Sequence, residues 1–338
     1  MIPRFPGDPP KDLSRPLEEV KILVDKPLDG ARLDRALVRF LTWRSRNSIH
    51  RLIRDGHVLL EGRRARPATK VRMGEVLRIK IPKRPEPQAP VAPDDTDIHI
   101  LHEDRYMIAV DKPPGLAVHP AGRRVHGTLI HFLHTRYRRP QDPDHDVVPR
   151  LLHRIDRETS GVVMASLHED FHSQVARQFE DRKVQKTYLA VVHGCPEPVT
   201  GLIDLGIGPD KSSSIRLKLK AHGDGSGLPA LTRYRVVRRN SRFALVEMTP
   251  KTGRTHQLRV HMAALGCPLV GDKVYGVDDS IFLDYLDDQL SDASREHLVL
   301  PRHALHNSSL RFHHPDEDRE MVITASLPPD MAALVPEE

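Results

Sequence analysis

The segment HRIDRETSG, His153 to Gly161, holds the residues of this chain that are best suited to chemistry. Its aspartate, Asp156, lies between Arg154 and Arg157. A carboxylate close to guanidinium groups stays ionised, so it can act as a nucleophile or base rather than as a general acid. The alternative is an Arg–Asp pair that only fixes a turn. Apolar runs on both sides predict that the segment is a tight loop between buried elements.

Two other segments carry residue types that are found in active sites. Lys186 and Tyr188 lie at the start of the apolar run TYLAVVHG, where a tyrosine is more often a core residue than a site residue. The second segment, KTGRTHQLRVH, runs from Lys251 to His261 and leads from a predicted strand into a predicted helix. Because Gly253 and Arg254 lie at that turn, we expect the guanidinium of Arg254 to reach a neighbouring carboxylate.

The sequence lacks the motifs that would indicate a cofactor or a membrane. It contains neither glycine-rich nucleotide-binding motif and no HExxH pattern, so we predict no cofactor and no metal. Cys195 and Cys267 form no CxxC pair, which is typical of a reduced protein. No apolar run reaches the length of a membrane span, and no signal peptide is recognisable. We expect a soluble, cytoplasmic protein, with a monomer as the default.

Hydropathy and composition divide the chain into four segments. Residues 1–19 are rich in proline and charge and are predicted to be disordered. Residues 20–81 form a compact unit with two short helices and short strands. Residues 82–97 form a proline-rich linker. From 98 to 335, apolar strands such as GVVMASL and FALVEMTP alternate with amphipathic helices such as HEDFHSQVARQFEDRKV, which predicts a mixed α+β sheet.

Positive charge is concentrated in the compact N-terminal unit. The whole chain has a formal net charge of +6 and a pI of about 9.3. Between Arg32 and Arg84, sixteen lysines and arginines stand against four acidic residues. Four arginines lie on or just before the second helix, where they could face RNA phosphates: Arg44, Arg46, Arg51 and Arg54. The alternative is a solvated helix face, but an excess this local favours nucleic acid.

Two resemblances follow from these motifs. RLDRALVRFL, SRNSIHRLIRDGHVLLEG and VRMGEVLRIKI together resemble an S4 RNA-binding domain. VDKPPGLAVHP, HRIDRETSG, KTY, GRTHQLRVH and RHALH, in this order, resemble the RluA family of pseudouridine synthases. The resemblance implies a small S4 domain followed by a catalytic domain with a mixed, largely antiparallel central sheet. It also implies an enzyme without a cofactor that isomerises uridines in structured RNA, most readily large-subunit ribosomal RNA.

The resemblance also assigns a role to individual residues. Asp156 matches the catalytic aspartate, which attacks either C6 of the uracil or C1′ of the ribose. Arg254 matches the arginine that pairs with it. Tyr188 matches the tyrosine that stacks on the uracil and is a candidate for removing the C5 proton. Arg154 matches an arginine that enters the RNA stack where the uridine leaves it, and Leu258 fits an apolar wall of the pocket. The rival hypothesis is a non-catalytic RNA-binding or ribosome-assembly factor that retains the fold.

The sequence leaves some questions open. It does not say which uridine is modified, or whether the RNA is ribosomal or transfer RNA. The acidic segment from Val277 to Leu300 matches none of the motifs and has no predicted role.

Overall fold

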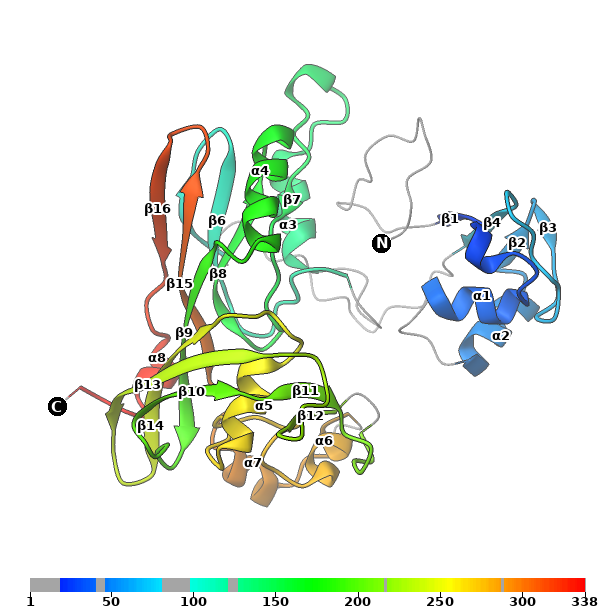
Figure 1. Ribbon diagram of the computed structural model, residues 1–338. Helices are drawn as coiled ribbons and strands as arrows, with labels where there is room; N and C mark the ends of the chain where they lie inside the picture. Colours follow the sequence, from blue (N-terminus) through cyan, green and yellow to red (C-terminus); the bar gives the residue numbers. More distant parts are fainter. Residues whose placement is uncertain are drawn as a thin grey trace. The chain divides into compact units, whose positions relative to one another are not determined.

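The computed structural model describes residues 19–40, 46–80, 98–120, 127–215, 218–286 and 289–337 (Figure 1). The chain divides into two compact units. The first spans Met1–Asp95 with His119–Val148, and the second spans Thr96–Val118 with Pro149–Glu338, each as far as it is described. The predicted linker at 82–97 and residues 1–18 of the predicted tail lie outside the described residues.

The N-terminal part of the first unit is a small antiparallel sheet with two helices against it. The strands are β1 (Glu19–Leu23), β2 (Val58–Leu60), β3 (Arg63–Arg64) and β4 (Val76–Lys80), in the order β1-β4-β2-β3. A short 3-10 helix (Lys26–Leu28) precedes α1 (Leu33–Phe40) and α2 (Arg46–Arg54). Alternate apolar residues of the strands and one face of each helix form a single core. Glu19, predicted to end the tail, instead begins β1, because its backbone pairs with Lys80.

A buried aspartate joins the two helices of this unit. Asp34 in α1 is fully buried and accepts hydrogen bonds from Nε and Nη2 of Arg32, at 3.0 and 3.1 Å. Nε2 of His50 in α2 lies 2.9 Å from its Oδ2. The Arg32 hydrogen bond is the main cause of the strongly lowered pKa of Asp34, which outweighs the opposing effect of burial. The carboxylate is therefore charged and fixes α2 against α1.

The second unit is built on a ten-stranded sheet. Its main order is β10-β13-β14-β9-β15-β8-β6-β5, with β16 beside β15 and β7 beside β8. The strands are β5 (His99–Glu103), β6 (Met107–Lys112), β7 (Arg150–Leu151), β8 (Ser160–Ser166), β9 (Gln185–His193), β10 (Thr200–Asp204), β13 (Leu231–Arg239), β14 (Phe243–Pro250), β15 (Leu305–His314) and β16 (Arg319–Thr324). Among the described strand pairs only β8–β15 is parallel, so the prediction of a mixed, largely antiparallel sheet is confirmed.

A glycine permits the parallel pair at the centre of this sheet. Gly161 has a φ of +109°, which side-chain-bearing residues rarely adopt, and a Cβ there would collide with the backbone of Asn307 in β15. Asn307 also donates from Nδ2 to the carbonyl of Val162, at 2.7 Å. The close approach places the start of β8, and thus the loop before it, beside the start of β15.

Helices and a small hairpin cover the sheet (Figure 1). Helix α4 (Glu169–Glu180) packs on β8 and β15, and α5 (Gln257–Ala264) packs on β14 and on the hairpin of β11 (Gly206–Pro209) and β12 (Leu219–His222). The other helices are α6 (Asp279–Leu286), α7 (Asp292–Leu298) and α8 (Pro329–Ala332), with α3 (Leu129–Tyr137) and a 3-10 turn (Pro143–His145) in the first unit.

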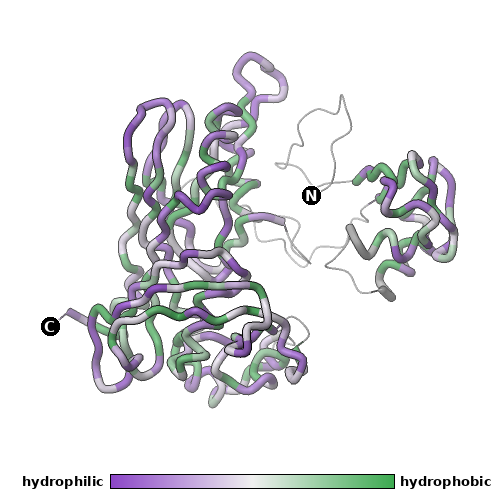
Figure 2. Tube along the Cα trace, in the orientation of Figure 1, coloured by the Kyte–Doolittle hydropathy of each residue, from purple (hydrophilic) through white to green (hydrophobic). Residues whose placement is uncertain are grey.

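Hydropathy along the trace fits this arrangement. Hydrophobic and hydrophilic residues are interspersed along α4 in Figure 2, as expected for a helix with one buried face, whereas every residue of β8 is buried. In α4 the predicted apolar row is present, with Phe171 and Val175 fully buried and Phe179 packed against the same core. In the part of the chain that the structure describes, no helix is long and apolar enough to cross a membrane.

Candidate active site

Asp156 lies in the loop that connects β7 with β8, as the sequence predicted. The backbone N–H of Thr159 donates to the carbonyl of Asp156, at 3.2 Å, which closes the turn. The next carbonyl, that of Arg157, accepts from the backbone N–H of Gly115 at 2.9 Å and from Nζ of Lys112 at 3.1 Å. These contacts come from the VDKPPG segment at the end of β6. The loop is therefore fixed on both sides, while the side chain of Asp156 stays 30% exposed.

Arg259 is the arginine that holds Asp156. From the first turn of α5, its Nη1 donates to Oδ2 of Asp156, at 3.1 Å. Its Nε and Nη2 donate to the two carboxylate oxygens of Asp272, at 2.7 and 2.9 Å. Asp272 is fully buried and also accepts from the backbone N–H groups of Val274 and Tyr275. The bidentate pair with Asp272 fixes the guanidinium plane, so one N–H points at Asp156.

The predicted pairing of Arg254 with Asp156 is wrong. Arg254 precedes α5, is exposed, and donates from Nε to the carbonyl of Pro229, at 3.0 Å. Its backbone N–H donates to Oε1 of Gln257, at 3.0 Å, which fixes the turn while the Arg254 side chain stays exposed. Arg259 went unnoticed within the same motif, although an arginine between Leu258 and Val260 on a buried helix needs a buried acid.

The surroundings of Asp156 keep its carboxyl group ionised. Burial alone would raise its pKa, but His256, Arg259 and His303 lower it, and the net effect is a lowered pKa. Burial in turn lowers the pKa of His256, and that of His303 to about 3, so both imidazoles are neutral at pH 7. Arg259 is therefore the cation that keeps Asp156 charged at neutral pH.

The two histidines fix the neighbouring backbone. His256 has a left-handed conformation, with a φ of +56°; its Nδ1 lies 2.8 Å from the hydroxyl of Tyr275 and its Nε2 lies 3.9 Å from Oδ2 of Asp156. His303 precedes β15, and its Nε2 lies 2.8 Å from Oγ1 of Thr159. From the sequence, no role was predicted for His256. His256 lies three residues before Arg259 at the start of a helix, and this spacing could have indicated that both side chains lie on the same side of it.

Tyr188 and Leu258, predicted to stack on the uracil and to form an apolar wall, belong to one apolar cluster. Tyr188 lies on β9 opposite Met248, and Leu258 on α5 is 6% exposed. Burial raises the pKa of Tyr188 far above its ordinary value, and the charge of Asp156 adds to this rise. The phenol is therefore neutral over the whole physiological range.

The segment that the sequence left without a role contributes to the loop that carries Asp156. Nη2 of Arg157 donates to the hydroxyl of Tyr285 in α6, at 2.6 Å, and that hydroxyl donates to Oε1 of Glu158, at 3.4 Å. Lys273 donates to both oxygens of Glu158, at 3.1 and 2.9 Å. Asp279 anchors the start of α6 through Nζ of Lys218, at 2.7 Å. The segment from 277 to 300 thus fixes the two residues that follow Asp156.

The remaining predicted residues are either exposed or not fully described. Arg154 is exposed on the same loop as Asp156. Arg44 lies outside the described residues, and only the backbone of Arg46 and Arg51 is described, within α2. Arg54 is exposed at the end of α2, and its Nε donates to the carbonyl of His50 at 3.4 Å.

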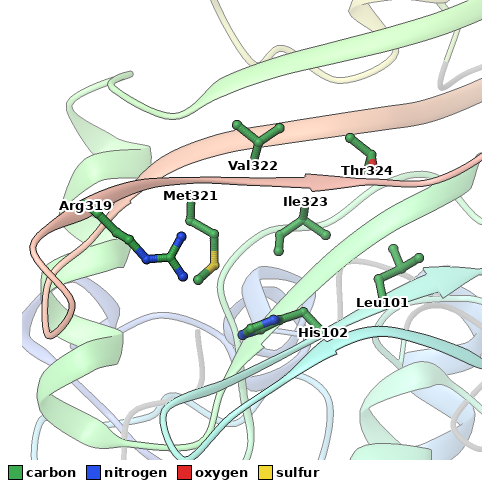
Figure 3. A pocket seen from close by; sticks show the side chains of 7 residues that line it. All are labelled: Leu101, His102, Arg319, Met321, Val322, Ile323 and Thr324. Atoms are coloured by element: carbon green, nitrogen blue, oxygen red, sulfur yellow. The ribbon is translucent and has the colours of Figure 1, made fainter.

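One cavity lies away from this site, between the edges of β5 and β16 (Figure 3). Met321 and Ile323 point from β16 toward Leu101 and His102 of β5, whereas Val322 and Thr324 point to the other side of the strand. Met321 and Ile323 belong to the core that also contains Leu101. The cavity is a gap at the edge of the sheet, and no residue of the Asp156 site lines it.

Three groups beside this cavity could be mistaken for a metal site. One ligand atom each of Asp104, His314 and Glu317 lies within 4.8 Å of the others. However, Nδ1 of His314 accepts a hydrogen bond from the backbone N–H of Glu317, at 3.1 Å. The proton of the neutral ring is therefore on Nε2, the atom that faces Asp104 at 3.6 Å. A protonated nitrogen cannot coordinate a metal ion, so the arrangement does not support a metal site.

Comparison with known proteins gives consistent matches. The RNA pseudouridylate synthase family matches residues 106–264, and the S4 domain family matches residues 31–77. An RNA pseudouridine synthase of Chloroflexus aurantiacus is 36% identical, over 93% of this chain and 92% of the relative. Ribosomal large subunit pseudouridine synthase D of Xanthomonas campestris is 34% identical, over 90% and 88%. The solved structure of human RNA pseudouridylate synthase domain containing 1 has a TM-score of 0.54 and 26% identity, over 70% of this chain and 87% of that one.

Proposed function

We propose that this chain, which belongs to the RluA family of RNA pseudouridine synthases, uses Asp156 to isomerise uridines in large-subunit ribosomal RNA. As a member of this family it is an isomerase, and its S4 domain makes RNA its partner. Support for the ribosomal target comes from relatives named ribosomal large subunit pseudouridine synthase D, in Xanthomonas campestris and Zymomonas mobilis.

The observation that carries the proposal is the ionised, accessible carboxylate of Asp156. Arg259 occupies Oδ2, and no hydrogen bond to Oδ1 is found among the described residues. Oδ1 is therefore free to form a bond to the substrate, at C6 of the uracil or at C1′ of the ribose. The N1–C1′ bond then breaks, the detached base turns, and C5 bonds to C1′. The proton on C5 is released, N1 takes up a proton, and the carboxylate is regenerated when its bond to the substrate breaks.

The residues around Asp156 have separate roles in this reaction. Tyr188 offers a flat ring next to the apolar side chain of Leu258, which suits stacking on a uracil that has left the RNA helix. Because the raised pKa keeps its phenol neutral, Tyr188 is a stacking surface rather than a ready base for the C5 proton. Arg154, exposed on the same loop, is suited to enter the space that the uridine leaves.

The basic N-terminal unit would hold the RNA while the second unit acts on it. Arg44, Arg46, Arg51 and Arg54, on or just before α2, are proposed to contact phosphates. Deletion of residues 1–90 should then weaken RNA binding and reduce its dependence on salt. Equal affinity and equal salt dependence of the truncated and full-length proteins would contradict this role.

The catalytic proposal is tested with RNA that carries tritium at C5 of its uridines, because formation of the new C–C bond releases that tritium. The wild-type protein is compared with Asp156→Asn, which has nearly the same shape but no negative charge. We expect release by the wild type and none by the variant, with RNA binding by both. Binding without release by either protein would instead support a non-catalytic RNA-binding or ribosome-assembly factor.

A further inference from the structure

Lys186 lies at the start of β9, two residues before Tyr188. Alternate residues of a strand point to the same face of the sheet, so Lys186 is on the face from which Tyr188 contributes to the candidate pocket. The side chain is half-buried, and its Nζ lies 5.0 Å from the centre of the Phe179 ring in α4.

The ammonium group of the half-buried Lys186 lacks the anionic or carbonyl partners that the buried Lys112 and Lys273 have. Lys112 donates to three backbone carbonyls, and Lys273 donates to Glu158 and to the carbonyl of Pro301. For Lys186, no hydrogen bond or ion pair is found within the described part of the chain. Burial without a counter-charge lowers the pKa of its ammonium group and costs free energy that a bound anion would recover.

The groups around Lys186 are aromatic and uncharged. The Phe179 ring stacks on the ring of His153, with centres 5.2 Å apart and planes 17° from parallel. Nε2 of His153 accepts from the backbone N–H of Met164, at 3.1 Å. Burial lowers the pKa of His153 to about 3, with a smaller effect from Lys186, so this imidazole carries no charge at pH 7. Because His153 directly precedes Arg154, this uncharged surface adjoins the loop of Asp156.

We propose that Lys186 binds a backbone phosphate of the RNA substrate next to the nucleotide that stacks on Tyr188. The choice of ligand rests on the proposed function, because RNA is the polyanion that such an enzyme must hold beside Asp156. A phosphate at this position would give the ammonium group its missing anion, and Phe179 would keep the long side chain in place. The contact is independent of base identity, since it reaches only the backbone.

The test is the salt dependence of RNA binding. The probe is a fluorescently labelled transcript of the large-subunit ribosomal RNA segment that the wild-type protein binds most tightly. The variants are Lys186→Gln, Lys186→Arg and, as a matched control, Lys183→Gln, which removes an exposed lysine 3.6 Å from Asp181. Thermal unfolding of each variant shows whether the fold is kept.

Loss of one phosphate contact lowers the slope of log K against log salt concentration by about 0.7–0.9. At 0.1 M salt, Lys186→Gln should therefore bind about 5- to 8-fold more weakly. Lys186→Arg should keep the slope of the wild type, and so should Lys183→Gln. In the tritium-release assay, Lys186→Gln should raise KM and keep kcat within about twofold of the wild type. The reason is that the contact is made both before and during the reaction.

An unchanged salt slope in Lys186→Gln would overturn the proposal. A purely structural lysine, packed on Phe179, would lower the unfolding temperature and leave the slope as it was. The slope is read from binding alone, so it can be measured even if the wild-type protein releases no tritium. Failure of the proposed function and failure of the Lys186 contact are thereby distinguished.

Discussion

Replacement of Arg259 by lysine tests which of the two arginines of the GRTHQLRVH segment supports Asp156. Arg259 makes three hydrogen bonds to carboxylates, two to Asp272 and one to Asp156. A lysine keeps the charge but has a single nitrogen, which cannot span both acids with the geometry of a guanidinium group. Because Asp272 is fully buried and Asp156 is 30% exposed, we expect the lysine to stay with Asp272 and to lose Asp156.

The size of the effect follows from the hydrogen bond that is lost. A hydrogen bond to a charged group contributes about 1.5–3 kcal/mol, and the partial exposure of Asp156 favours the lower part of that range. A loss of about 1.5–2 kcal/mol corresponds to about a 10- to 30-fold decrease in kcat/KM. Arg254→Lys removes only an exposed hydrogen bond to the neutral carbonyl of Pro229, so its kcat/KM should fall by less than about threefold.

The assay is tritium release from C5-labelled RNA under single-turnover conditions, with RNA binding measured for the same variants. The two substitutions are matched in chemistry and lie five residues apart, so only the position differs. If Arg254→Lys loses as much activity as Arg259→Lys, or if Arg259→Lys is fully active, the assignment of Arg259 as the support of Asp156 is wrong.

Three further outcomes are expected. Asp272→Asn leaves the buried Arg259 without its main counter-charge and should cost about 3–5 kcal/mol of the free energy of unfolding, measured with denaturant; a change under about 1 kcal/mol would show that the pair is not needed. Tyr285→Phe removes the hydroxyl that holds Arg157 and should lower kcat about fivefold. Its control is Tyr234→Phe, which removes a hydroxyl that donates to the carbonyl of Pro198 and should keep near wild-type activity. The pKa of Asp156 is lowered below the ordinary value of an aspartate, so its charged form is lost only in acid. The value of kcat/KM should therefore show no limb from this group near neutral pH, and Arg259→Gln should move the acid limb to higher pH.

Local patterns were enough to predict most elements of the fold. Short apolar runs located β8, β9 and β14, and the helical spacing of Phe171, Val175 and Phe179 located α4. Gly161 could be read as a turn residue, but its need for glycine comes from β15, which is far away in the sequence. A contact of that kind leaves no local pattern.

Only part of the site could be predicted, because its other contacts also join residues that are far apart in the sequence. The loop position of Asp156 between two strands agrees with expectation, whereas the shared cluster of Tyr188 and Leu258 was not predicted. The choice between Arg254 and Arg259 depended on where α5 begins, and helix boundaries are the least certain feature of a sequence pattern. The contact between Tyr285 and Arg157 joins residues 128 positions apart, which no motif in either segment could indicate.

Pseudouridine mapping of large-subunit ribosomal RNA tests the central claim most directly. RNA is compared from cells that lack this protein and from the same cells supplied with the wild type or with Asp156→Asn. We predict that specific pseudouridines disappear without the protein, return with the wild type, and stay absent with Asp156→Asn. Full restoration by Asp156→Asn, or an RNA that is unchanged when the protein is absent, would contradict the account.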